Sequence, residues 1–416
     1  MSDIANPGEN ALLSNHPSNS LSQDEESPSK QASSQAAMWH RTRRNAMMRK
    51  YGDKIGPLER DSSSNALALS LLLTSNASLF GLSLLSGRLP WQQVFLLALF
   101  PGSMFSLWTL QILHDLLHGS LLDKRSNSFL GLKKSVATDR LMFWGSMPSA
   151  FGYYLYLKYG HLTHHKNLGD PSSASLKQLF ESDRVDFEDG DVLFVSHRMK
   201  LKGEVGPAFQ VGGRNVTMSI SKAGFNSWKE GKLLRNVIAF ATSFMYERMM
   251  LTINDAVVAV TGRNYFFPNK PEKFHRECAN YCRCAVAIRA LLWKIAGWKS
   301  LLFLYLSETL WSIPPHPASA MFVSNHGSSV DESGQCIPSS STYAGRWYSI
   351  FTLFTNYHCE HHDFPQVPLH RLGELRRIAP EFYPKGSKDN VFRIMAKAFT
   401  RPDFYACMDS NIQMVS

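Results

Sequence analysis

The stretch NYHCEHHDFP, at residues 356–365, places three histidines within five positions. If it is helical, positions i, i+3 and i+4 share one face, so the three imidazoles point the same way. The stretch HLTHH at 161–165 repeats this spacing, and HDLLH at 114–118 places two histidines one helical turn apart. We call these three stretches the histidine boxes. The eight box histidines are His114, His118, His161, His164, His165, His358, His361 and His362.

This histidine pattern predicts a metal centre. The chain has 15 histidines, and random scatter does not place more than half of them in three five-residue windows. Imidazole suits iron, zinc, copper and nickel. One ion takes only about four to six ligands, so the set predicts two ions. No H-E-x-x-H hydrolase motif is present. Two irons in a nitrogen-rich site suit dioxygen activation and attack on an unactivated C–H bond. We expect His326 as a further metal ligand.

Two uncharged runs, Ala66–Ser86 and Trp91–Leu113, predict a membrane hairpin. Each can cross a hydrocarbon core of about 30 Å as a helix. The preceding segment, Trp39–Arg60, holds seven Lys and Arg against two acidic residues. Such a bias is typical of cytosolic flanks, so the hairpin is expected to begin and end on the cytosolic side.

The rest of the apolar sequence predicts further membrane contact. The segment Leu141–Leu157 is short, and a crossing there would put the first and second boxes on opposite sides. We therefore expect an interfacial or re-entrant segment. The runs Ala285–Leu306 and Thr309–Ser324 predict a second hairpin that turns at Ser307 and Glu308. The fold class is thus mainly α, with about four transmembrane helices and a cytosolic helical cap that holds the metals.

Composition divides the chain into four parts. Residues 1–38 are expected to be a disordered tail, and 39–64 a basic juxtamembrane segment. Residues 65–385 form the predicted membrane domain, with a cytosolic insert at about 166–232, and 386–416 form a C-terminal tail. The net charge is +10. The basic residues lie beside apolar runs and are not interleaved with aromatic residues, which favours a membrane surface and argues against nucleic acid.

The other histidines carry weaker predictions. His316 follows two prolines, and we expect it to line a substrate channel. Asp170 and Asp363 follow the second and third boxes, where they are either outer partners of the ligands or helix-end charges. The five histidines expected at the surface are His16, His40, His197, His275 and His370.

The box pattern resembles the membrane fatty acid desaturase and hydroxylase superfamily. Over roughly residues 40–385 it is most similar to the sphingolipid Δ4-desaturases, through the boxes and the stretch FVSNH at 322–326. The resemblance implies a helical membrane enzyme with a cytosolic diiron site and O2 as co-substrate. It implies electrons from cytochrome b5 and its reductase at the endoplasmic reticulum, with both termini cytosolic. No fused cytochrome b5 segment is visible, so a separate donor protein is expected.

The predicted function is O2-dependent desaturation of a long-chain lipid, the sphingoid base of dihydroceramide or a fatty acyl chain. A hydroxylase or a carotenoid oxygenase with the same site is an alternative, because a small change in geometry decides the outcome. A non-catalytic membrane adaptor with a relic site is a further alternative. The intact set of box histidines argues against a relic.

Overall fold

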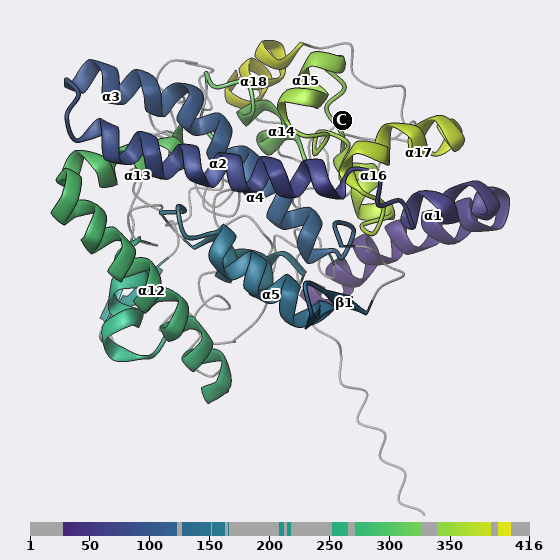
Figure 1. Cartoon of the computed structure of the whole chain (residues 1–416). Helices are drawn as coiled ribbons and strands as arrows, with labels where there is room; N and C mark the ends of the chain where they lie inside the picture. Colours follow the sequence, from purple (N-terminus) through teal and green to yellow (C-terminus); the bar gives the residue numbers. More distant parts are fainter. Residues whose placement is uncertain are drawn as a thin grey trace, which may run out of the picture.

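The computed structural model describes residues 28–122, 127–150, 152–162, 165, 208–211, 214–217, 252–264, 271–313, 315–325, 339–383 and 390–400. The described residues are mainly helical, with two small antiparallel ribbons (Figure 1). Most of the insert predicted at 166–232 lies outside these residues, as do His164, Asp170 and His326.

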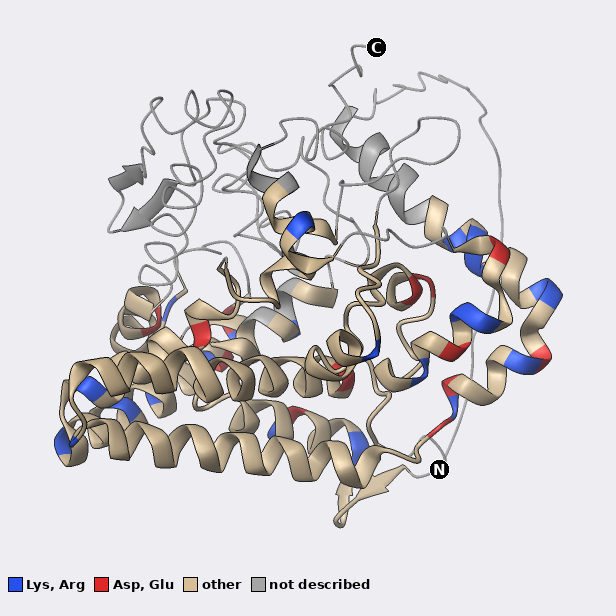
Figure 2. Cartoon of the chain, turned by 90° about the horizontal axis from the view of Figure 1, so that it is seen from above, with Lys and Arg blue, Asp and Glu red and all other residues tan. Residues whose placement is uncertain are grey.

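Two helical runs in the described part of the chain are long and apolar enough to cross a membrane. One is α2 (Asn65–Ser86), and the other joins α3 (Trp91–Leu97), η1 (Ala98–Gly102) and α4 (Ser103–Leu117). Only 22% of the most apolar part of α2 is buried, whereas the core helix of a soluble protein is mostly covered. Figure 2 shows that the helices of these two runs are mostly free of charge along their middle parts. Lys and Arg residues lie near the helix ends, and others lie on other elements. The two runs coincide with the predicted first hairpin.

Helix α4 is the central element. It packs against α2, α5 (Lys134–Gly145) and α13 (Trp298–Leu310). The Thr109 hydroxyl on α4 donates to Oδ1 of Asn76 on α2 (3.1 Å), and the Asn76 amide donates to the carbonyl of Gly145 (2.8 Å). Small polar side chains of this kind hold apolar helices together where hydrophobic burial gives little specificity. The first histidine box lies at the end of this well-held helix.

The second predicted pair of helices has different boundaries from those expected. Helix α12 (Glu272–Ala296) ends at Gly297, whose φ of +73° favours glycine, and α13 begins at Trp298. The predicted turn at Glu308 is wrong, because this residue lies inside α13. Glu308 is 1% exposed and accepts hydrogen bonds from the Ser149 hydroxyl and the Ala150 backbone N–H. These bonds fix Glu308 in the core.

The turn after α2 and the turn between α12 and α13 lie together. The rings of Trp91 and Trp298 are 4.6 Å apart, and the Lys299 ammonium lies 4.9 Å from the Trp91 ring. Gly87 sits against the backbone of Ala296. In Figure 1 these turns lie at the left, whereas α1 (Pro28–Glu59), α16 (His358–Asp363) and α17 (Leu372–Ile378) lie toward the right. The turn between α2 and α3 and the turn between α12 and α13 therefore lie at the same end of the fold.

At the opposite end, α1, α16 and α17 pack around a core of Met47, Ile55, Leu369, Leu372 and Leu375. The helix α1 begins within the predicted tail and bends at a non-helical residue, Tyr51. Three further short helices belong to the main core, which also includes α4: α14 (Ser319–Ser324), α15 (Arg346–Phe351) and α18 (Val391–Thr400). The remaining elements are β1 (Ser128–Phe129), β2 (Leu132–Lys133), α6 (Tyr153–Leu155), η2 (Tyr156–His161), β3 (Ala208–Val211), β4 (Arg214–Thr217), a helix at Thr252–Thr261, η3 (Leu369–Arg371) and η4 (Pro380–Phe382).

Replacing Gly87 by alanine should destabilise the protein, because the new Cβ would overlap the carbonyl of Ala296, which is backbone and cannot rotate away. Overpacking of this kind costs about 1–3 kcal/mol. The matched control is Gly81→Ala in α2, where a Cβ meets nothing within 4 Å and helix propensity gains about 0.5–1 kcal/mol. Thermal unfolding in detergent measures both. Equal midpoints for the two variants would contradict the close contact of the turns.

Candidate metal centre

The first box is placed by the end of α4. His114 lies in the last turn of the helix, and His118 is the residue that follows it, still with helical backbone angles. Their ring centroids are 4.8 Å apart, as expected for side chains one turn apart on one face. Between them, Asp115 accepts a hydrogen bond from the backbone N–H of Leu369 (3.3 Å), which ties the end of α4 to η3. The first box is thus held by a rigid helix.

The second and third boxes lie on short elements. His161 ends η2, and His165 follows four residues later. The third box forms α16, a helix of six residues that begins at His358. Ser341 donates from its hydroxyl to Glu360 (2.6 Å) and accepts from the backbone N–H of Cys359 (2.9 Å), which fixes the start of this short helix.

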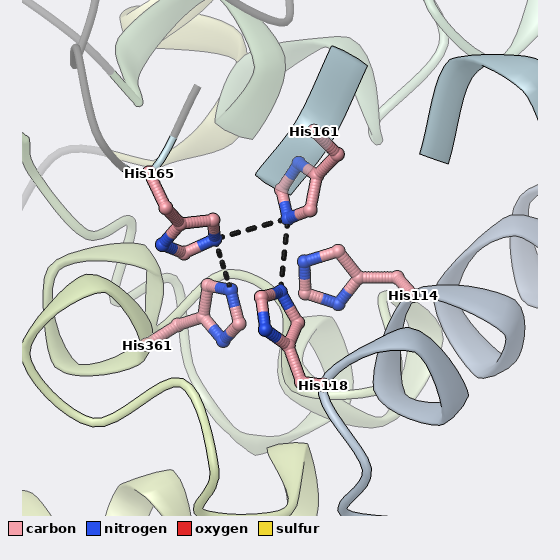
Figure 3. Close-up of side chains that lie close together, drawn as sticks. All are labelled: His114, His118, His161, His165 and His361. Carbon is pink, nitrogen blue, oxygen red and sulfur yellow. Dashed lines mark hydrogen bonds between the residues drawn. The ribbon is translucent and has the colours of Figure 1, made fainter. Parts of the chain in front are cut away.

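Five histidines from all three boxes converge on one point. The nitrogens of the set all lie within 4.8 Å of one another, and Figure 3 shows the rings turned toward a common centre. Nε2 of His118 lies 3.1 Å from Nε2 of His161. Nε2 of His165 lies 3.0 Å from that same His161 nitrogen and 3.0 Å from Nε2 of His361. We call this set the five-histidine cluster; its members are His114, His118, His161, His165 and His361.

The spacing of the nitrogens fits a shared cation. A neutral imidazole nitrogen carries one proton or one lone pair, so Nε2 of His161 cannot form full hydrogen bonds to two neighbouring nitrogens. A metal ion bound by all of them removes this conflict. Nitrogens about 2.1 Å from one ion and at right angles around it lie about 3.0 Å apart, which is the spacing seen here. An all-imidazole donor set suits a transition metal such as iron, zinc or copper.

A second group of nitrogens lies beside the cluster. Nε2 of His362 is 3.0 Å from Nε2 of His358, and the ring centroid of His362 is 4.3 Å from that of His165. The predicted ligands His164 and His326 lie outside the described residues. The structure thus brings together the seven box histidines that it describes, five in one cluster and two as an adjoining pair.

Helix α16 also carries two buried acidic side chains in different electrostatic settings. Burial raises the pKa of Glu360 to about 8, despite the hydrogen bond from Ser341. Burial would raise the pKa of Asp363 as well, but the charges and hydrogen bonds of His40 and Arg43 outweigh it and hold that pKa below its ordinary value. Asp363 is therefore a buried ionised carboxylate next to the ligands, and it is bound by α1.

Two histidines predicted at the surface are buried. His275 is 1% exposed and accepts a hydrogen bond from the backbone N–H of Asn264 (3.1 Å). His40 is 5% exposed and contacts Asp363. The prediction for His40 was wrong because this residue lies in the basic segment Trp39–Arg60, whose composition gives no sign of a buried partner. His40, Arg43 and Met47 are spaced three and four positions apart and share one helix face. This spacing was the signal that could have indicated the buried position of His40.

The remaining predicted positions differ in outcome. His370 is half-buried, with its Nε2 3.4 Å from an Asp61 oxygen. His316 lies outside the cluster; its Nε2 is 3.1 Å from the Ser103 hydroxyl, and its ring is 5.7 Å from that of Phe351. Its role in a substrate channel stays a prediction. His16 and His197 lie outside the described residues.

The fold and site define a mainly helical protein with membrane-length helices and an all-histidine cluster that could hold a metal ion. The chain belongs to the fatty acid desaturase family: the family model, described as fatty acid desaturase, matches residues 89–391, which is more than half of the chain. The predicted superfamily is confirmed, and membrane association follows from the family together with the apolar helices.

Curated relatives are similar over a shorter region. A sphingolipid delta(4)-desaturase DES1-like protein of Oryza sativa subsp. japonica is 39% identical over 101 residues, which are 24% of this chain and 28% of the relative. A sphingolipid delta(4)-desaturase DES1 of Drosophila melanogaster is 36% identical over 98 residues, again 24% and 28%. A sphingolipid delta(4)-desaturase/C4-monooxygenase DES2 of Bos taurus is 33% identical over 101 residues, with the same shares. The chain thus spans about 28% of the length of these relatives. No solved structure matches the chain.

Replacing His361 by alanine should lower the affinity for iron by more than about 100-fold, since loss of a supporting outer contact alone costs about 10–100-fold. The measurement is iron per purified full-length chain, by elemental mass spectrometry. His370→Ala is the control, because this histidine is half-buried and outside the cluster. An unchanged iron content in the His361 variant would show that the cluster does not hold the metal.

Proposed function

We propose that the chain is an O2-dependent membrane lipid desaturase that introduces a double bond into the sphingoid base of a dihydroceramide-type lipid. The observation that carries this proposal is the five-histidine cluster at the end of a membrane-length apolar helix. A site at the end of such a helix suits lipid substrates, whose long chains lie in the membrane and whose polar ends lie at the membrane surface.

The residues of the cluster are compatible with iron, because imidazole nitrogen suits iron among the transition metals. Membership of the fatty acid desaturase family favours iron among these metals. We propose two irons, held by the cluster and by a second group that includes His358 and His362, completed by His164 and His326. When bound, the irons would supply dioxygen activation for attack on unactivated C–H bonds. The protein's own part is to fix the ligands and to place the lipid chain beside them.

The overall reaction must balance electrons as well as atoms. Removing two hydrogens from adjacent CH2 groups, together with O2, two protons and two electrons, gives one C=C bond and two waters. The electrons come from a separate donor, and we propose cytochrome b5 and its reductase. Which methylene lies nearest the metals decides where the double bond forms.

The relatives support the sphingoid base as the substrate. All three relatives described above are named as sphingolipid delta(4)-desaturases. The bovine relative is also named as a C4-monooxygenase, which favours hydroxylation as the second candidate function. In that reaction one oxygen atom stays on the carbon and a single C–H bond is broken.

We further propose a membrane topology of two hairpins with the metal centre on the cytosolic side, in the endoplasmic reticulum. The paired turns that carry Trp91 and Trp298 support a shared luminal end, because tryptophan and lysine are typical of the membrane interface. The basic helix α1 and the basic residues Lys133, Lys134 and Arg140 lie outside the spans and favour the cytosolic side.

Cysteine labelling in sealed microsomes tests this topology. Arg88 in the turn after α2 and Arg49 on α1 are both exposed and are predicted to lie on opposite sides. An impermeant maleimide should modify Arg49→Cys in intact microsomes and Arg88→Cys only after detergent is added, above the background of the unchanged chain. Labelling of both variants in intact microsomes would contradict the hairpin.

A lipid profile tests the proposed activity. The full chain is expressed in a yeast whose sphingoid bases lack this double bond, fed dihydroceramide, and compared by mass spectrometry with a His361→Ala control. We expect a product two mass units lighter on the sphingoid base, at a level at least about 100-fold lower in the control.

Other products would change the assignment in a defined way. A loss of two mass units from fatty acyl chains would support desaturation, with a fatty acyl chain as the substrate in place of the sphingoid base. A product sixteen units heavier would identify the hydroxylase. No new lipid from a chain that holds no iron would favour the non-catalytic adaptor.

A further inference from the structure

One face of α1 lies against the third histidine box. The residues on this face are spaced i, i+3, i+4 and i+7, so they form a continuous stripe on the helix. The Arg44 guanidinium donates to the carbonyl of Asp363 (3.4 Å) and lies 4.9 Å from the Phe364 ring. The sulfur of Met47 lies 3.4 Å from the Tyr383 hydroxyl. We call this stripe the α1 clamp; its residues are His40, Arg43, Arg44 and Met47.

The contacts of the α1 clamp centre on the carboxylate of Asp363, whose side chain is fully buried. His40 Nδ1 lies 2.6 Å from Oδ1 of Asp363. Arg43 donates to Oδ2 from Nη2 (3.0 Å) and from Nε (3.3 Å). Two partners on α1 therefore hold the residue directly after the ligand His362. A buried carboxylate with two such partners is costly to leave unpaired.

We infer that His40 is a positioning residue for the metal centre: through Asp363 it fixes α16, and with it His358 and His362. His40 lies outside the region matched by the family model, which begins at residue 89. This inference rests on the proposed metal centre.

The geometry separates this role from that of a ligand. Both ring nitrogens of His40 are already engaged, Nδ1 by Asp363 and Nε2 by the Ser339 hydroxyl at 2.9 Å. Its ring centroid lies 5.3 Å from that of His362, and it is not a member of the five-histidine cluster. His40 therefore acts on the metals only through the segment that it holds.

Helix α16 needs such support because it is short. A helix of six residues is not stable by itself in water, and it must aim three imidazoles at once. Its start is fixed by Ser341, and its end is fixed by the α1 clamp. The five-histidine cluster takes one ligand from α16 and four from other elements. The adjoining pair takes both of its described members, His358 and His362, from α16. Loss of the clamp should therefore weaken the second site first.

The test is the iron content and the rate of iron loss of the purified full-length protein in detergent. His40→Ala should lower bound iron from two per chain toward one. The more weakly held iron should pass to a ferrous chelator about 10- to 100-fold faster than in the unchanged chain. Asp363→Asn, which keeps the shape and removes the charge, should do the same. His40→Asn should partly restore iron retention, because its amide N–H can replace the donor at Nδ1.

The control is Arg41→Ala, an exposed residue beside His40 on the same helix, which should keep both irons. If His40→Ala fails to fold, Arg43→Lys removes the paired donors while keeping the charge, and it should show the same selective loss. Two irons and unchanged release in all clamp variants would overturn the inference, and so would equal loss from both sites. An unchanged chain that holds no iron would overturn the proposed metal centre, and the inference with it.

Discussion

The convergence of imidazole nitrogens from three separate segments is the constraint on which the rest of the structure depends. The Nε2 atoms of His118 and His165 lie 3.1 Å and 3.0 Å from Nε2 of His161, which can form only one full hydrogen bond. The proposed metal ion would remove this conflict, and a scaffold must hold the rings together. The scaffold has three parts: the buried helix α4, the end of η2, and the short helix α16.

These three supports differ in strength. Helix α4 is held along its length by α2, α5 and α13, so the first box is stabilised by the bundle of apolar helices. Helix α16 has no such length and depends on side chains at its two ends, Ser341 at one and the α1 clamp at the other. The site thus joins a long apolar bundle, suited to a lipid chain, to a polar cap that carries the third box. The proposed reaction needs this arrangement, because its lipid chain would lie in the membrane and its electron donor would come from the aqueous side.

Much of this could be predicted from the sequence, and the rest could not for physical reasons. Local spacing reports which residues share a helix face, and the structure brings described histidines of all three boxes together. The two membrane-length runs coincide with the first predicted hairpin, because run length and charge can be read directly from the sequence. The turn predicted at Glu308 was wrong, because a buried carboxylate held by a serine hydroxyl and a backbone N–H looks the same in sequence as a charged residue in a loop. The role of His40 was missed because its partner, Asp363, is 323 positions away. Only tertiary structure brings that pair together.

X-ray absorption at the iron edge of the loaded, purified protein tests the central claim most directly, because it reports the atoms bound to the metal. An imidazole cage predicts a first shell of nitrogen or oxygen at about 2.1 Å, with the outer-shell scattering that rigid imidazole rings produce. That signature should weaken when one cluster histidine is replaced. A shell containing sulfur, or a nitrogen–oxygen shell without the imidazole pattern, would show that the iron is held elsewhere and would contradict the account.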